Sequence, residues 1–107
     1  MTEATLDPED NKIITLARAA APYRRRRGAA VRDETGRTYS ATNVALPSLT
    51  LSALQVAVAM AVSSGAESLE AAALVTAGEG PSEADRAAVT DLGAKALFTA
   101  GPDGTLR

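Results

Sequence analysis

The sequence contains no cysteine and no histidine among its 107 residues. Disulfide bonds, thiolate nucleophiles and cysteine metal ligands are therefore excluded, as is the imidazole that most often acts as a general base near neutral pH. Aromatic residues make up only 3% of the chain, whereas hydrophobic residues make up 46%. A core must accordingly be built from alanine, valine, leucine and isoleucine side chains.

Basic and acidic residues are nearly balanced, since the chain has 11 basic and 13 acidic residues and a net charge of −2. A general nucleic-acid-binding protein usually has a clear basic excess, so we do not expect one here. The first ten residues are acidic and lack an apolar segment, so we expect no signal peptide and a cytoplasmic protein. The length predicts one domain over residues 1–107, with residues 1–6 as a loose tail.

One uncharged stretch, Leu49 to Val62, dominates the middle of the chain. Laid on a helix it is apolar nearly all the way round, which is typical of a buried helix. It is shorter than the run of about 20 apolar residues that a membrane-spanning helix needs. We therefore expect the central core helix of a small domain, ending near Gly65, which suits a left-handed position after the helix.

A helix and a hairpin are predicted before this stretch. Asp7-Pro8 is a strong helix start, and the helix should end before Pro22. Two strands are expected at residues 28–32 and 37–41, joined by a turn at 33–36, with residues 42–48 as a connection.

Three further elements are predicted after it, namely a strand at 69–76, a helix at 82–92 and a strand at 95–99. This order favours an α/β fold in which a mixed sheet lies between helices, a three-layer α/β/α domain with a buried central helix.

Five short segments occur along the chain in an order that is informative about its family. They are Ala21-Pro22-Tyr23, Gly28-Ala29-Ala30-Val31, Thr42-Asn43-Val44, Leu49-Thr50-Leu51-Ser52-Ala53-Leu54 and Gly80-Pro81-Ser82-Glu83-Ala84-Asp85-Arg86. With the order of elements over residues 10 to 100, they resemble the small homo-oligomeric cytidine deaminases. The resemblance implies a cytidine deaminase-like fold and, as the family activity, hydrolytic deamination of cytidine or deoxycytidine.

In zinc deaminases, cysteine or histidine holds a zinc ion that activates water, and a glutamate transfers protons. The resemblance places the three ligand positions on Ser52, Ser82 and Asp85, and the glutamate position on Leu54. Hydroxyl groups are poor zinc ligands, and a leucine side chain transfers no proton. We therefore predict no metal, no cofactor and no catalytic residue.

The same helix starts have a simpler interpretation. Ser52-x-x-Gln55 and Ser82-x-x-Asp85 both fit the capping-box pattern. In this pattern the first side chain accepts a hydrogen bond from the backbone N–H of the fourth residue, and the fourth side chain accepts one from the backbone N–H of the first. We interpret both as ordinary helix caps in preference to a residual metal site.

The substrate-binding positions implied by the resemblance are also altered. The family's Asn-x-Glu pair, which holds the ribose, becomes Asn43 and Ala45. Four arginines, Arg24, Arg25, Arg26 and Arg27, fill the interval that holds a base-stacking aromatic residue in the family. Asn43 and these arginines are candidate ligand-binding residues, since arginine matches phosphate oxygens. The alternative is a capping asparagine and a solvated loop partly paired with Asp33 and Glu34.

The leading hypothesis is a catalytically inactive protein of the cytidine deaminase fold with an oligomeric interaction or scaffold role. We expect a homo-oligomer, either a dimer or a tetramer, with neither nucleic acid nor membrane as a partner. An alternative is a zinc-free protein that binds a nucleoside or nucleotide. A second alternative is a cytidine deaminase with a non-standard site.

Overall fold

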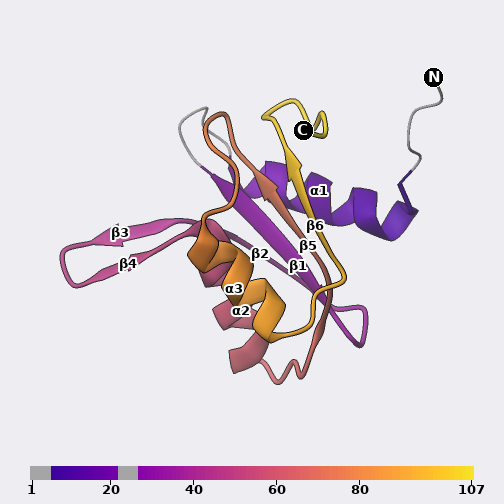
Figure 1. The fold of residues 1–107 in the computed structure, drawn as a ribbon, viewed down its shortest axis with the longest axis horizontal. Coiled ribbons are helices and arrows are strands. Elements are labelled where there is room, and N and C mark those ends of the chain that lie inside the picture. Colours follow the sequence, from indigo (N-terminus) through magenta and orange to yellow (C-terminus); the bar gives the residue numbers. More distant parts are fainter. Residues whose placement is uncertain (1–5, 22–26) are drawn as a thin grey trace.

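The computed structural model describes residues 6–21 and 27–107, which form three helices and six strands (Figure 1). In chain order these are α1 (Pro8–Ala20), β1 (Gly28–Asp33), β2 (Thr38–Thr42), β3 (Val44–Leu46), β4 (Leu49–Leu51), α2 (Ala53–Ser63), β5 (Leu69–Val75), α3 (Glu83–Asp91) and β6 (Ala96–Ala100).

Helix α1 begins and ends where the sequence predicts. The Asp7 side chain accepts a hydrogen bond from the Glu9 backbone at 2.9 Å, and Pro8 occupies the first helical position. The helix ends at Ala20, two residues before Pro22. The predicted loose tail is wrong at Leu6, which packs partly buried against the core. Residues 1–5 of that prediction lie outside the described residues.

Four strands form a mixed sheet in the order β2-β1-β5-β6. Strand β1 pairs antiparallel with both β2 and β5, whereas β5 and β6 are parallel and are linked through α3. The predicted turn between β1 and β2 is present, with Gly36 at φ 87°. The start of β1 and the ends of β5 and β6 lie together at one end of the sheet.

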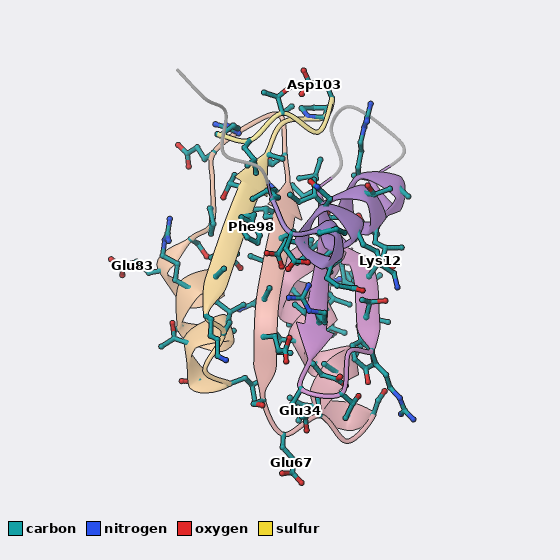
Figure 2. The ribbon with its side chains drawn as sticks, turned by 90° about the vertical axis from the view of Figure 1, so that its right-hand side faces the viewer. Lys12, Glu34, Glu67, Glu83, Phe98 and Asp103 are labelled. Carbon is teal, nitrogen blue, oxygen red and sulfur yellow. The ribbon has the colours of Figure 1, made fainter. Side chains whose placement is uncertain are left out.

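Helices cover both faces of this sheet, which confirms the three-layer prediction (Figure 1). Alternate residues of each strand face opposite layers. Ala29 and Val31 of β1 pack in one cluster with α2 and α3, whereas Ala30 packs with α1 in a second cluster. In Figure 2, Lys12 of α1 and Glu83 of α3 accordingly lie on opposite sides of the sheet.

The structure corrects two predictions in the middle of the chain. Residues 49–51 are strand β4 rather than the first turn of a helix, and the connection over 42–48 contains strand β3. The two strands form a hairpin that projects from the body of the molecule (Figure 1). Helix α2 begins only at Ala53, because Ser52 caps it and holds extended backbone geometry.

Helix α2 is buried on one face and exposed on another. Ala53, Leu54, Ala57 and Ala61 lie in the core. Met60 and Val62 are 40% and 49% exposed in the single chain, so the expectation that the helix is covered on all sides holds for one face. Among the described residues, no helix is long and apolar enough to cross a membrane.

Candidate functional site

Ser52 forms a complete capping box at the start of α2. Its hydroxyl oxygen accepts a hydrogen bond from the Gln55 backbone at 3.1 Å, and the Gln55 side chain accepts one from the Ser52 backbone at 2.9 Å. This satisfies backbone donors that would otherwise lack partners at the first turn. The predicted cap is confirmed.

Ser82 and Asp85 form the same arrangement at the start of α3. The Ser82 oxygen accepts from the Asp85 backbone at 3.0 Å, and Asp85 Oδ2 accepts from the Ser82 backbone at 3.0 Å. The carboxylate also lies in the first turn, where the helix dipole favours negative charge. This second predicted cap is therefore confirmed as well.

The two caps are joined to each other. The Ser52 hydroxyl donates a hydrogen bond to Asp85 Oδ1, across 33 positions of sequence. Asp85 is only 2% exposed, so this carboxylate is buried and has a hydrogen-bond partner on each oxygen. The structure thus brings Ser52, Ser82 and Asp85 together at the meeting point of two helix N-termini.

Leu54 lies in the first turn of α2, two residues beyond Ser52, and is fully buried. It belongs to the apolar cluster that also contains Ala53 and Val89 of α3. A side chain in this position contributes packing and leaves the site without an acid or base at that point.

The Ser52 hydroxyl already has two hydrogen-bond partners within this group. The Ser52 oxygen accepts from Gln55 and donates to Asp85, so its hydroxyl hydrogen is committed. An alcohol becomes a good nucleophile only with a positioned base to take its proton, and the chain has no histidine for that task. The network is buried at Asp85, half-buried at Ser52 and exposed to solvent at Ser82.

The same residues fit a zinc ion poorly. Zinc is held in proteins mostly by thiolate, imidazole and carboxylate ligands, and this group offers two neutral hydroxyls and one carboxylate. Both carboxylate oxygens already accept hydrogen bonds within the group. Within residues 6–21 and 27–107, no cluster of three or more histidine, cysteine, aspartate or glutamate side chains is arranged to hold a metal.

A second group of polar residues lies where β2 ends. The Thr42 hydroxyl donates to the Arg27 carbonyl oxygen at 2.8 Å and lies 3.3 Å from Asn43 Oδ1. Thr42, which sequence reasoning did not single out, therefore connects two of the predicted ligand-binding residues. Its only signal in the sequence is its place beside Asn43.

The other ligand-binding predictions have different outcomes. Arg24, Arg25 and Arg26 lie outside the described residues. Arg27 lies just before β1, whereas Asp33 and Glu34 lie at the far end of that strand, so the suggested pairing with these acids is wrong for Arg27. Ala45, on β3, is exposed and offers no polar atom beyond its backbone.

Comparisons with known proteins agree with this architecture. The family model described as cytidine deaminase-like matches residues 6–104. The crystal structure of cytidine deaminase from Burkholderia pseudomallei is similar with a TM-score of 0.73 and 27% identity, over 90% of this chain and 87% of that one. The enzyme from Mycobacterium tuberculosis gives a TM-score of 0.70 and 27% identity, over 94% and 90% of the two chains.

A third structure, cytidine deaminase from Mycobacterium leprae, gives a TM-score of 0.71 over 94% of this chain and 93% of that one. At 20% identity it supports the fold alone. A search of curated proteins finds no match.

Proposed function

Because this chain belongs to the cytidine deaminase-like family, we propose that it is a catalytically inactive member that acts by associating with further copies of itself. The observation that carries the proposal is the hydrogen bond from Ser52 to the buried carboxylate of Asp85. It joins two helix N-termini through one polar group in which both carboxylate oxygens of Asp85 accept hydrogen bonds.

The positions that the family resemblance assigns to zinc and to the proton-transferring glutamate support the loss of activity. Ser52, Ser82 and Asp85 are occupied with capping, and Leu54 is occupied with core packing. Deamination needs an activated water and a group that moves protons. On this proposal the chain supplies neither, and the residues at this site contribute to the stability of the fold rather than to catalysis.

An uncharged surface supports self-association. Sequence between Arg37 and Glu67 contains no charged residue. On the β3–β4 hairpin, Leu46 and Leu49 lie directly opposite each other and are 57% and 49% exposed. An isolated two-stranded hairpin has marginal stability in water. Contact with another protein surface would remove this apolar pair from water and stabilise the hairpin.

Met60 and Val62 of α2 are also exposed and come from the same uncharged segment of the sequence, and we define Leu46, Leu49, Met60 and Val62 together as the uncharged surface. A surface without charges of either sign suits contact with an identical surface, since no like charges oppose one another. We propose a dimer or tetramer built through it, in the cytoplasm.

Sedimentation velocity tests this association directly. The chain should sediment as a dimer or tetramer at micromolar concentration, and Met60→Glu should shift it toward the monomer by burying an unpaired charge. Thr90→Glu, which adds the same charge on the exposed side of α3, is the matched control and should leave the assembly intact. A monomeric parent chain would overturn the proposed association.

A second candidate function is binding of a nucleoside without deamination, favoured by one observation. Asn43 Oδ1 and the backbone carbonyl oxygen of Arg27 lie within hydrogen-bond distance of the same Thr42 hydroxyl, so a positioned amide remains at Asn43, where the family resemblance places a ribose contact. Calorimetric titration with cytidine and deoxycytidine tests it, and the absence of saturable binding at millimolar ligand would rule it out.

A further inference from the structure

Two arginine side chains from distant parts of the sequence reach the same glycine. Arg107 Nη1 donates hydrogen bonds to the carbonyl oxygens of Gly78 at 2.6 Å and of Thr76 at 3.2 Å. On the same glycine, a β-carbon would lie 3.7 Å from Arg27 Nη2. The two guanidinium groups thus meet at the loop that follows β5.

This loop is held in shape by its own contacts. The Thr76 side chain is buried, and its hydroxyl oxygen accepts from the Gly78 backbone at 3.0 Å. The segment after β6 lies alongside, because the Arg107 backbone donates to the Thr99 carbonyl at 2.8 Å. Both arginines are therefore presented from positions fixed by the sheet.

Neither guanidinium group is neutralised by a described partner. Within residues 6–21 and 27–107, the ion pairs closer than 4.0 Å involve Arg32 with Asp10 and Glu70, and none involves Arg27 or Arg107. Two acids lie in the same segments. Glu79 is exposed beside Gly78, and the Asp103 carboxylate accepts from the Thr105 backbone at 2.9 Å.

Two guanidinium groups without carboxylate partners are the donors that a phosphate group prefers, since each offers N–H groups in a planar fork. Arg107 uses Nη1 on carbonyl oxygens, and Nε and Nη2 have no partner among the described residues. We propose that Arg27 and Arg107, with the Gly78 loop between them, form a binding site for a phosphate monoester.

The location connects this phosphate site with the rest of the molecule. The Gly78 loop leads directly to Ser82, the cap of α3, and Arg27 is joined through Thr42 to Asn43. The site lies at the end of the sheet where β1 begins and β5 and β6 finish. Asp103 marks this end in Figure 2, and Glu34 and Glu67 mark the opposite end. A nucleotide is thus the natural form of the monoester, with its phosphate on the arginines and its sugar toward Asn43.

The test is an NMR titration of the ¹⁵N-labelled chain at constant ionic strength with inorganic phosphate, cytidine monophosphate and cytidine. Phosphate and the monophosphate should shift the Gly78 amide and the arginine Nε–H signals saturably. Arg27→Lys and Arg107→Lys keep the charge but lose the fork, and each should weaken binding about tenfold. Arg37→Lys, at the far end of the β1–β2 hairpin, is the matched control and should leave binding unchanged.

The outcomes separate this inference from the proposed function. Absence of saturable shifts with either phosphate compound would overturn the site, as would equal weakening by Arg37→Lys, since that indicates general charge attraction. Binding of cytidine alone would overturn the phosphate site while supporting nucleoside binding. Self-association and the absence of deamination are measured separately, so neither depends on this result.

Discussion

Ser52 and Asp85 are 33 residues apart in the sequence, and the hydroxyl of one donates a hydrogen bond to the carboxylate of the other. Each also belongs to the capping box of its own helix. The same atoms therefore terminate two helices and fasten them together. A change at either residue is therefore expected to weaken the packing of α2 against α3.

Removing this contact should destabilise the fold. Ser52→Ala and Asp85→Ala each remove one partner of the contact and are each expected to lower the free energy of unfolding by about 2 kcal/mol, because the change disturbs a buried hydrogen-bonded group. The double variant should reveal a coupling energy of about 1 kcal/mol, measured by urea unfolding. Ser82→Ala, which removes a cap without touching Ser52, is the control. Strict additivity of Ser52→Ala and Asp85→Ala would contradict the contact.

Leu54 should behave as a core residue. Leu54→Ala is expected to cost about 3 kcal/mol of stability, since a fully buried leucine leaves a cavity. Leu54→Glu should cost more and yield no deaminase activity, because the surrounding serines and Asp85 remain unsuited to zinc. Leu49→Ala, on the exposed hairpin, should cost little in the same urea unfolding experiment. Recovery of activity in Leu54→Glu would contradict this assignment.

The lowered pKa of Asp33 predicts that the stability of the fold depends on pH. Burial by itself raises the pKa of this carboxyl, but hydrogen bonds from Thr35, Arg37 and Tyr39 outweigh it and hold the pKa below its ordinary value of 3.8. A pKa lower in the folded than in the unfolded state stabilises the fold above the unfolded value. That contribution is lost as the pH falls through the folded-state pKa.

Asp33→Asn should therefore destabilise the chain near neutral pH, and its difference from the parent should shrink below about pH 4. Urea unfolding across this range measures the effect. Asp91→Asn, with an exposed side chain on α3, is the control and should show little difference at any pH. A constant deficit of Asp33→Asn from neutral to acid would show that the carboxylate charge is irrelevant.

Gly28 fixes the distance between α1 and β1. A β-carbon at this position would lie 1.9 Å from the Ala17 carbonyl oxygen, which is backbone and cannot turn aside. Gly28→Ala should lower stability by about 3 kcal/mol through overpacking. At Gly80 the nearest atom would be 3.9 Å away, so Gly80→Ala should be tolerated. Comparable melting temperatures for the two variants would contradict this account.

Local sequence signals predicted most of the helix and strand positions. Asp7-Pro8 and Gly36 identify a helix start and a turn, and both serine caps could be recognised from spacing alone. These features depend on neighbouring residues, whose chemistry is visible in order along the chain.

The β3–β4 hairpin was missed because Leu49 to Leu51 continues without a break into the apolar helix. The capping box at Ser52 was the signal that the helix starts later. The link from Ser52 to Asp85, and the meeting of Arg27 with Arg107 at Gly78, depend on tertiary packing. Nothing in the neighbouring sequence indicates either contact.

We propose that the hydrogen-bonded Ser52–Asp85 group does not support deamination. The most direct measurement is the ultraviolet absorbance of cytidine incubated with the purified chain and added zinc, beside a zinc-only control. We predict no conversion to uridine above that control. Turnover that depends on both protein and zinc would contradict the account.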